Sequence, residues 1–77
     1  MSEGVKFLDL LDRLPPLISR RDVPKLLGGI ISAKSLANAD SRGEGPEDRI
    51  CLGRRIAYPT ISLLQWLDKK RKKITKE

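Results

Sequence analysis

Hydrophobic and polar positions follow a helical spacing through residues 6–42, alternate across residues 50–58, and return to helical spacing after Pro59. Spacings of three and four residues are typical of helices that bury one face, and alternation is typical of strands. The pattern therefore predicts three to four short helices and one β-hairpin. We expect a mostly α fold with a small β-hairpin.

The N-terminal stretch predicts a short helix over about Lys6 to Arg13, which Pro15 and Pro16 end. A helix this short is unstable alone, so its apolar positions need a partner. The domain's own core or a second subunit could supply that partner, and we expect the core. The apolar positions are Phe7, Leu8, Leu10, Leu11 and Leu14.

Two starts are open for the next helix. Ser19 with Asp22 three residues later resembles a capping box, but Pro24 would then lie inside the helix. With Asp22 as the N-cap, Pro24 falls in the first turn, where its missing N–H is not needed. We favour Asp22, with residues 19–21 as a preceding turn and Gly28-Gly29 at the helix end. The expected buried face is Val23, Leu26 and Leu27.

The helix expected over residues 32–42 has the clearest division between faces. Residues 28–31 form the turn before it, in which Ile30 and Ile31 are expected to fill the core. Ser32 is a strong N-cap residue, and Gly43 is a typical C-terminal stop. At about 100° per residue, one polar arc holds Lys34, Ser35, Asn38, Ser41 and Arg42. The opposite side holds Ala33, Leu36 and Ala37, with Asp40 among them and Ala39 at the boundary.

This polar arc carries side chains that can read base pairs in a DNA major groove. Asparagine pairs with adenine, arginine and lysine pair with guanine, and serine reaches bases or phosphates. An ordinary solvent-facing helix has a similar polar side, so the arc alone does not distinguish a recognition helix from a surface helix. As a hypothesis, the base-reading residues are Lys34, Ser35, Asn38 and Arg42.

Two registers are open for the hairpin. In the first, residues 53–55 form the loop and one face gathers the apolar side chains Ile50, Leu52, Ile56 and Tyr58. In the second, a tight Gly53-Arg54 turn suits type II′ geometry but pairs Leu52 with Arg55. We favour the first because it keeps the apolar side chains together. In both, Arg54 and Arg55 lie at or beside the tip, where they can contact phosphates or enter a minor groove.

Pro59 ends the second strand, and Thr60 is the expected N-cap of a closing helix. We expect Trp66 to be a core anchor of this helix rather than a base-stacking residue. The basic run Lys69 to Lys73 extends the helix toward the C-terminus. The apolar face of the helix is formed by Leu63, Leu64, Trp66 and Leu67.

The length of the chain and the distribution of its charges limit the range of expected functions. At 77 residues the chain is a single domain near the lower limit for burying its own core. Residues 1–48 hold seven Lys/Arg against eight Asp/Glu, whereas residues 49–77 hold nine against two. The positive charge is thus concentrated in the hairpin and the C-terminal tail, which suits a polyanionic partner. We divide the chain into an N-terminal extension (1–16), a central domain (17–68) and a basic tail (69–77).

Several classes of protein are not expected from this composition. The chain has no histidine and a single cysteine, Cys51, so we expect no internal disulfide, no metal site and no cofactor. No serine or cysteine has a plausible base beside it, and an enzyme is not expected. No apolar run approaches the roughly 20 residues of a membrane span, and the N-terminus lacks a signal-peptide pattern. We expect a cytoplasmic, nucleoid-associated protein that binds neither a membrane nor a small molecule.

Five short motifs follow one another at characteristic spacing: RDVPKLLG (21–28), SLAN (35–38), SRGEGP (41–46), LGRRIAY (52–58) and LLQWL (63–67). Together they resemble the small helix-turn-helix proteins of the excisionase and AlpA type, which are relatives of the MerR winged-helix DNA-binding domain. The resemblance covers residues 17–68. It implies a winged helix-turn-helix, with helix 32–42 as the recognition helix and residues 52–58 as the wing.

Three positions depart from that family pattern. Ala39 stands where an aromatic residue is often found, so we expect either looser packing or a gap filled by the N-terminal extension. Asp40 stands where a basic residue is common, and an acidic group there would repel phosphate. The turn at residues 29–31 is longer than usual, which would rotate the recognition helix.

The resemblance and the basic hairpin predict a sequence-specific binder of double-stranded DNA, such as a transcriptional regulator or a prophage excisionase-like factor. Helix 32–42 would enter the major groove, and the wing would lie on the backbone or in the minor groove. The expected backbone contacts are Arg20, Arg21, Ser41, Arg54, Arg55, Lys69 and Lys70.

The alternative is a protein-interaction module that binds a recombinase, repressor or polymerase subunit through the apolar face of residues 5–14. An excisionase-like factor would combine both properties, binding DNA and a recombinase. Self-association on DNA is also expected, because one small domain offers few contacts. Single-stranded nucleic acid is a poorer fit because stacking platforms are few. The aromatic residues are Phe7, Tyr58 and Trp66.

Overall fold

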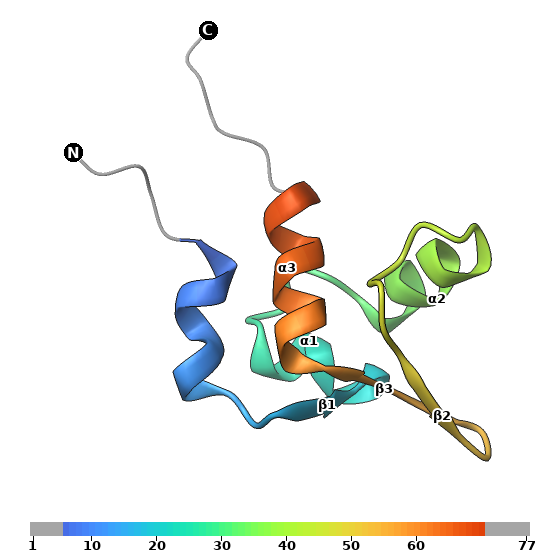
Figure 1. Cartoon of the computed structure of the whole chain (residues 1–77). Coiled ribbons are helices and arrows are strands. Elements are labelled where there is room, and N and C mark those ends of the chain that lie inside the picture. The colour runs from blue at the N-terminus through green and yellow to red at the C-terminus, as the bar shows by residue number, and fades with distance from the viewer. Residues whose placement is uncertain (1–5, 71–77) are drawn as a thin grey trace, which may run out of the picture.

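The computed structural model describes residues 6–70, in which a three-stranded antiparallel sheet lies along the lower edge of the molecule and the labelled helices stand above it (Figure 1). The fold is α+β: the expected short helices and hairpin are present, and the sheet has a third strand that was not expected. In chain order the elements are the 3-10 helix η1 (Phe7–Arg13), strand β1 (Leu17–Ser19), the 3-10 turn η2 (Arg20–Asp22), helices α1 (Val23–Leu26) and α2 (Ala33–Ser41), strands β2 (Ile50–Leu52) and β3 (Arg55–Pro59), and helix α3 (Thr60–Lys70).

The sheet has the strand order β1-β3-β2. β1 pairs with β3 so that Ile18 lies opposite Tyr58, and both side chains are buried. The sequence did not predict β1, because three residues are too few for alternation to show. With β3 at its centre, the sheet joins the segment before η2 to the hairpin.

The helix expected after Asp22 is a single turn. α1 has Asp22 at its N-cap position and Pro24 in its first turn, as predicted, although the Asp22 side chain makes no capping hydrogen bond. The segment ends at Gly28 and Gly29, which both have positive φ values.

Only part of the expected apolar face of this segment reaches the core. Val23 and Leu27 are four residues apart on one face, and both are buried. Leu26 lies to one side of that face and is 42% exposed, and Ile30 in the following turn is 62% exposed. The prediction that Leu26 and Ile30 fill the core is therefore wrong, whereas Ile31 is partly buried against it.

α2 has the N-cap and the glycine stop that the sequence predicts. Ser32 is the N-cap, and its hydroxyl oxygen accepts a hydrogen bond from the backbone N–H three residues later at 3.0 Å. At the other end, Gly43 has a φ of 72° and donates to the carbonyl of Asp40 at 3.0 Å. The N–H of Glu44 donates to the carbonyl of Ala39 at 2.8 Å. This pair of bonds is a Schellman motif, which favours glycine at its left-handed position.

The hairpin takes the register that we did not favour. Its turn is the two residues Gly53-Arg54, with a φ of 62° at Gly53 and a negative φ at Arg54, as in a type II′ turn. This geometry suits the twist of the two strands, and the glycine accepts it without strain. Ile50 and Leu52 consequently lie on the outer face, 48% and 80% exposed. The facing pairs are Ile50 with Ala57, Cys51 with Ile56, and Leu52 with Arg55.

α3 supplies most of the core. Trp66 is buried as expected, and its indole N–H donates to the carbonyl of Glu44 at 2.7 Å. Thr60 is buried at the start of the helix, and its hydroxyl donates to the carbonyl of Pro15. That bond fixes the start of α3 to the chain just before β1. The apolar residues predicted on this helix, Leu63, Leu64, Trp66 and Leu67, are all buried.

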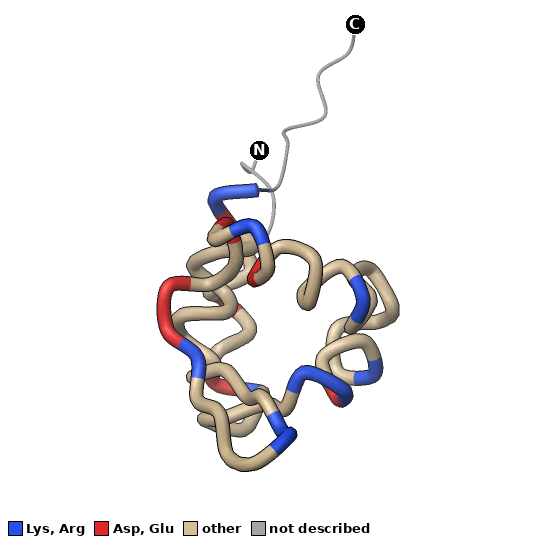
Figure 2. The backbone as a smooth tube through the Cα atoms, turned by 90° about the vertical axis from the view of Figure 1, so that its right-hand side faces the viewer, with Lys and Arg blue, Asp and Glu red and all other residues tan. Residues whose placement is uncertain are grey.

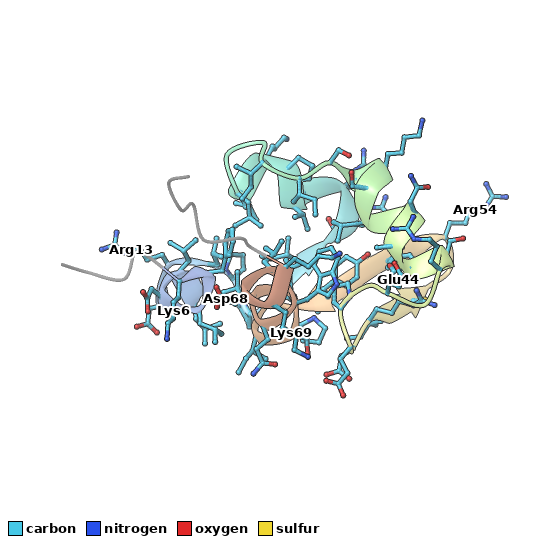
Figure 3. All side chains as sticks on the ribbon, turned by 90° about the horizontal axis from the view of Figure 1, so that it is seen from above. Lys6, Arg13, Glu44, Arg54, Asp68 and Lys69 are labelled. Carbon is cyan, nitrogen blue, oxygen red and sulfur yellow. The ribbon has the colours of Figure 1, made fainter. Side chains whose placement is uncertain are left out.

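η1 packs along α3, which confirms the expectation that the domain's own core covers its apolar face. The Asp68 carboxylate lies between the two helices and accepts hydrogen bonds from the N–H groups of Phe7 at 2.6 Å and Leu8 at 3.0 Å (Figure 3). In the same view η1 stands at one end of the molecule, and α2 and the hairpin stand at the other. No helix within residues 6–70 is long and apolar enough to cross a membrane.

Candidate nucleic-acid interface

The polar arc of α2 is turned to solvent. Leu36 and Ala39 are buried on the inner side of the helix, which fixes the side that faces outward. Ala39 is 3% exposed. The outward side chains are those that the sequence predicted, namely Lys34, Ser35, Asn38, Ser41 and Arg42.

Two of these residues have polar partners on the protein. The hydroxyl of Ser35 accepts a hydrogen bond from the N-cap hydroxyl of Ser32 at 3.0 Å. The guanidinium of Arg42 lies 3.1 Å from a carboxylate oxygen of Glu44, and both side chains are well exposed. An exposed ion pair of this kind stabilises by at most about 1 kcal/mol, so Arg42 can exchange its partner for a ligand.

Asp40, on the inner side of α2, is the centre of a polar network that joins four segments. One carboxylate oxygen accepts hydrogen bonds from the Tyr58 hydroxyl on β3 and from the Arg20 guanidinium on η2, each at 2.6 Å. The other oxygen lies 3.3 Å from the guanidinium of Arg49, just before β2. The Nε of Arg20 also donates to the Tyr58 oxygen at 3.0 Å. The network therefore fixes α2 relative to η2 and the hairpin.

The expectation that Asp40 repels phosphate stays a prediction, but the structure places its carboxylate inside the polar network instead of on the outer face of α2. Its side chain is 5% exposed and faces two guanidinium groups, so its charge is offset inside the molecule. One signal for this arrangement was present in the sequence, because Asp40 falls on the apolar side of the helical wheel. An acidic residue at a buried position needs a cationic partner, and the wheel does not reveal which arginine supplies it. Arg49, which sequence reasoning did not single out, is one of the two.

The network raises the pKa values of Arg20 and Tyr58. Burial lowers the pKa of Arg20, but its hydrogen bonds with Tyr58 and Asp40 outweigh that effect and raise the pKa above its ordinary value. Burial and the hydrogen bond to Asp40 raise the pKa of Tyr58 to about 12. At neutral pH the Arg20 guanidinium is therefore charged and the Tyr58 phenol is neutral.

The raised pKa of Tyr58 predicts a loss of stability at high pH. The folded protein keeps the phenol proton up to about pH 12, whereas an unfolded tyrosine loses it near pH 10. The folded state therefore binds more protons between these values, and its stability falls by roughly 2 to 3 kcal/mol as pH rises from about 10 to 12. Unfolding followed through the fluorescence of the single tryptophan should show this fall, and Tyr58→Phe should lack it. Equal pH dependence of the two proteins would refute the assignment.

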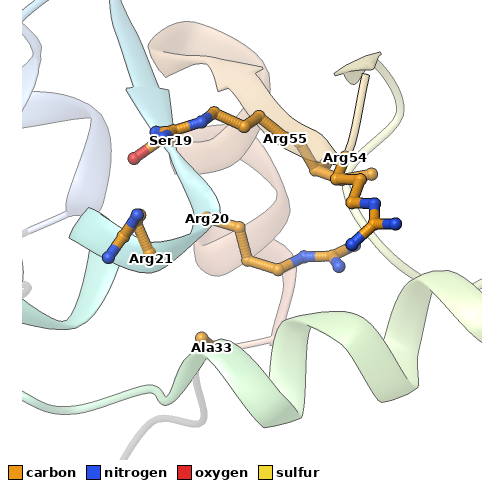
Figure 4. Close-up of a pocket in the computed structure, with 7 residues that line it drawn as sticks. Ser19, Arg20, Arg21, Ala33, Arg54 and Arg55 are labelled. Atoms are coloured by element: carbon orange, nitrogen blue, oxygen red, sulfur yellow. The ribbon is translucent and has the colours of Figure 1, made fainter. Parts of the chain in front are cut away.

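Four arginines from two separate parts of the chain line one surface hollow (Figure 4). η2 provides Arg20 and Arg21, and the hairpin provides Arg54 and Arg55. The hollow has a volume of about 220 Å³, and Ser19, Ala33 and Ile56 complete its lining. Because Ala33 is the first residue of α2, the hollow lies between the hairpin and the start of that helix. Figure 2 shows the Lys and Arg positions of η2 and of the hairpin turn in the same lower part of the molecule.

Two predicted backbone contacts lie elsewhere. Lys69 and Lys70 are in the last turn of α3, which points away from the hairpin turn (Figure 1). The ammonium of Lys70 lies over the Trp66 ring, 5.5 Å from its centroid. The structure does not bring these lysines together with Arg54 and Arg55, and residues 71–73 of the predicted basic run lie outside the described residues.

Comparisons with models of protein families, with curated proteins and with solved structures found no match to this chain.

Proposed function

We propose that this protein is a sequence-specific binder of double-stranded DNA that inserts α2 into the major groove. The supporting observation is that one helix presents Lys34, Asn38 and Arg42 outward while its other side is locked to the basic hairpin through Asp40. A helix fits the major groove, and these side chain types pair with base edges there. The position of the helix is set by buried contacts, which is what a reading surface requires.

The hairpin supplies the second part of this proposal. Arg54 and Arg55 are exposed at the turn, beside Arg20 and Arg21, and they would contact phosphates next to the groove that holds α2. Such a basic hairpin would act as a wing, and the protein would then be a winged helix-turn-helix transcriptional regulator or a prophage excisionase-like factor. If about five phosphates are neutralised, the logarithm of the binding constant falls with the logarithm of salt concentration with a slope of roughly −4 to −5.

The protein-interaction alternative has less support. It relied on the apolar face of the N-terminal segment, and the Phe7, Leu8, Leu10, Leu11 and Leu14 side chains of that face are packed against the core. α3 contacts η1 along its length, so this face is occupied within the chain.

Asn38 gives the sharpest test of base reading. A duplex enriched from a random pool by the wild-type protein serves as the cognate DNA, and a shuffled duplex of equal composition serves as the reference. Asn38→Ala should weaken cognate binding by about 10- to 100-fold, the equivalent of one bidentate base contact, and change shuffled binding little.

The matched control is Gln65→Ala, which removes an exposed amide from α3. It should leave both affinities unchanged. An equal loss on the two duplexes for Asn38→Ala would remove this residue from the reading surface. Failure to enrich any duplex would contradict the proposed function itself.

A further inference from the structure

The hollow lined by Arg20, Arg21, Arg54 and Arg55 has the size and the charge of an anion site. Its volume of about 220 Å³ corresponds to about seven water molecules at roughly 30 Å³ each in the liquid. A tetrahedral phosphate with several waters fits in that space. Among the described residues, those lining the hollow include no acidic side chain. The lining itself therefore does not offset the charges of four guanidinium groups.

Arg20 is held in place before any ligand arrives. Its guanidinium is bonded to Asp40 and Tyr58, and its side chain is 22% exposed. Asp40 lies behind Arg20 and outside the lining, where it is shared with Arg49. A donor that is already ordered loses little conformational entropy when a ligand binds.

The other three arginines approach the hollow from two sides. Arg21 is exposed on η2, and Arg54 and Arg55 are exposed on the hairpin. Like charges held close together repel, and an anion between them relieves that repulsion. A guanidinium also matches a phosphate with two parallel N–H groups. The start of α2 at the hollow adds the positive end of the helix dipole to the same potential.

We propose that this hollow is an oxyanion site that holds one phosphate group. In the DNA complex that group is a backbone phosphate beside the groove that α2 occupies, an identity which rests on the proposed function. The bound phosphate links η2 to the hairpin turn and so clamps the wing at the start of α2.

The first experiment uses the full chain without DNA. Sodium phosphate is titrated against sodium chloride of equal ionic strength while nuclear magnetic resonance follows the arginine Nε–H groups and the backbone amides. Saturable shifts confined to the four arginines of the hollow and Ala33 are expected with phosphate and not with chloride. Shifts that are equal for both salts, or spread over all basic residues, would overturn the site.

Variants of Arg55 test the geometry without disturbing the Asp40 network. Arg55→Ala should lower phosphate affinity by about 10-fold, since one charge-assisted bidentate contact is lost. Arg55→Lys keeps the charge but loses the guanidinium fork, and it should recover only part of the affinity. Arg13→Ala, on η1 at the far end of the molecule, should change nothing. Full recovery by Arg55→Lys would indicate attraction by net charge alone and contradict a built site.

Duplex binding separates this inference from the proposed function. Phosphate binding at the hollow without duplex binding would support the site and contradict the DNA-binding proposal. Duplex binding with no phosphate shifts, and with equal affinity for Arg55→Ala and Arg13→Ala, would support DNA binding and overturn the site. If both are correct, phosphate should compete with the duplex more strongly than chloride at equal ionic strength, and Arg55→Ala should remove that difference.

Discussion

Asp40→Ala is expected to destabilise the fold by about 3 kcal/mol or more. Removing the buried Asp40 carboxylate leaves Arg20, which is 22% exposed, without its partner, so the cost falls at the lower end of the roughly 3–5 kcal/mol typical of buried ion pairs. A domain of this length has a total stability of roughly 4–12 kcal/mol, so the loss is a large fraction of it. Arg20 and Tyr58 would lose their shared acceptor, and Arg49 would lose its partner. Urea unfolding followed by Trp66 fluorescence measures the change.

The control for this variant is Asp12→Ala, which removes an exposed carboxylate from η1. It should change the free energy of unfolding by less than about 0.5 kcal/mol.

Gly45→Ala perturbs the same polar network in a second way, because a Cβ at Gly45 would overlap the Asp40 carboxylate. If Asp40→Ala and Asp12→Ala unfold at the same urea concentration, the network does not hold the domain together.

Reversing the charge of the α2 arc is expected to abolish specific DNA binding while leaving the fold intact. The change is Lys34→Glu combined with Arg42→Glu, both at exposed positions on α2. Each base contact is worth about 1–3 kcal/mol, and carboxylates in their place also repel phosphates. We expect a loss of at least about 100-fold in affinity for the enriched duplex. Fluorescence anisotropy measures this affinity, and urea unfolding confirms that the variant is folded.

The matched control makes the same change in net charge at the far end of the molecule. This control combines Lys6→Glu with Arg13→Glu, at the N-cap and the last residue of η1, away from α2 and the hairpin (Figure 3). It should weaken binding only by the general effect of lower net charge, less than about 10-fold at physiological salt. If the two double variants lose affinity by the same factor, the α2 arc is not a reading surface.

The parts of the fold that the sequence predicted are those that local chemistry decides. Ser32 and Gly43 bound α2 because a side-chain cap and a left-handed glycine act over three or four residues. The apolar face of α3 was predicted correctly for the same reason, because the spacing of its apolar residues is a pattern within one helix. The solvent-facing arc of α2 was predicted as the complement of its buried side.

The parts that the sequence did not predict depend on contacts between distant segments. β1 exists because Ile18 packs beside Tyr58, 40 residues along the chain. The hairpin register was misjudged because grouping apolar side chains was weighed above the preference of Gly53 for a tight turn. The partners of Asp40 come from η2, β3 and the segment before β2, and no local pattern brings those three together.

A salt series of duplex binding is the decisive test of sequence-specific DNA recognition. The wild-type protein would be measured by fluorescence anisotropy against the enriched duplex and its shuffled counterpart, from low to physiological salt. The proposed function predicts a preference for the enriched duplex that survives at physiological salt, with a slope of roughly −4 to −5 for the cognate complex. Equal affinity for the two duplexes at every salt concentration, vanishing as salt rises, would contradict sequence-specific recognition.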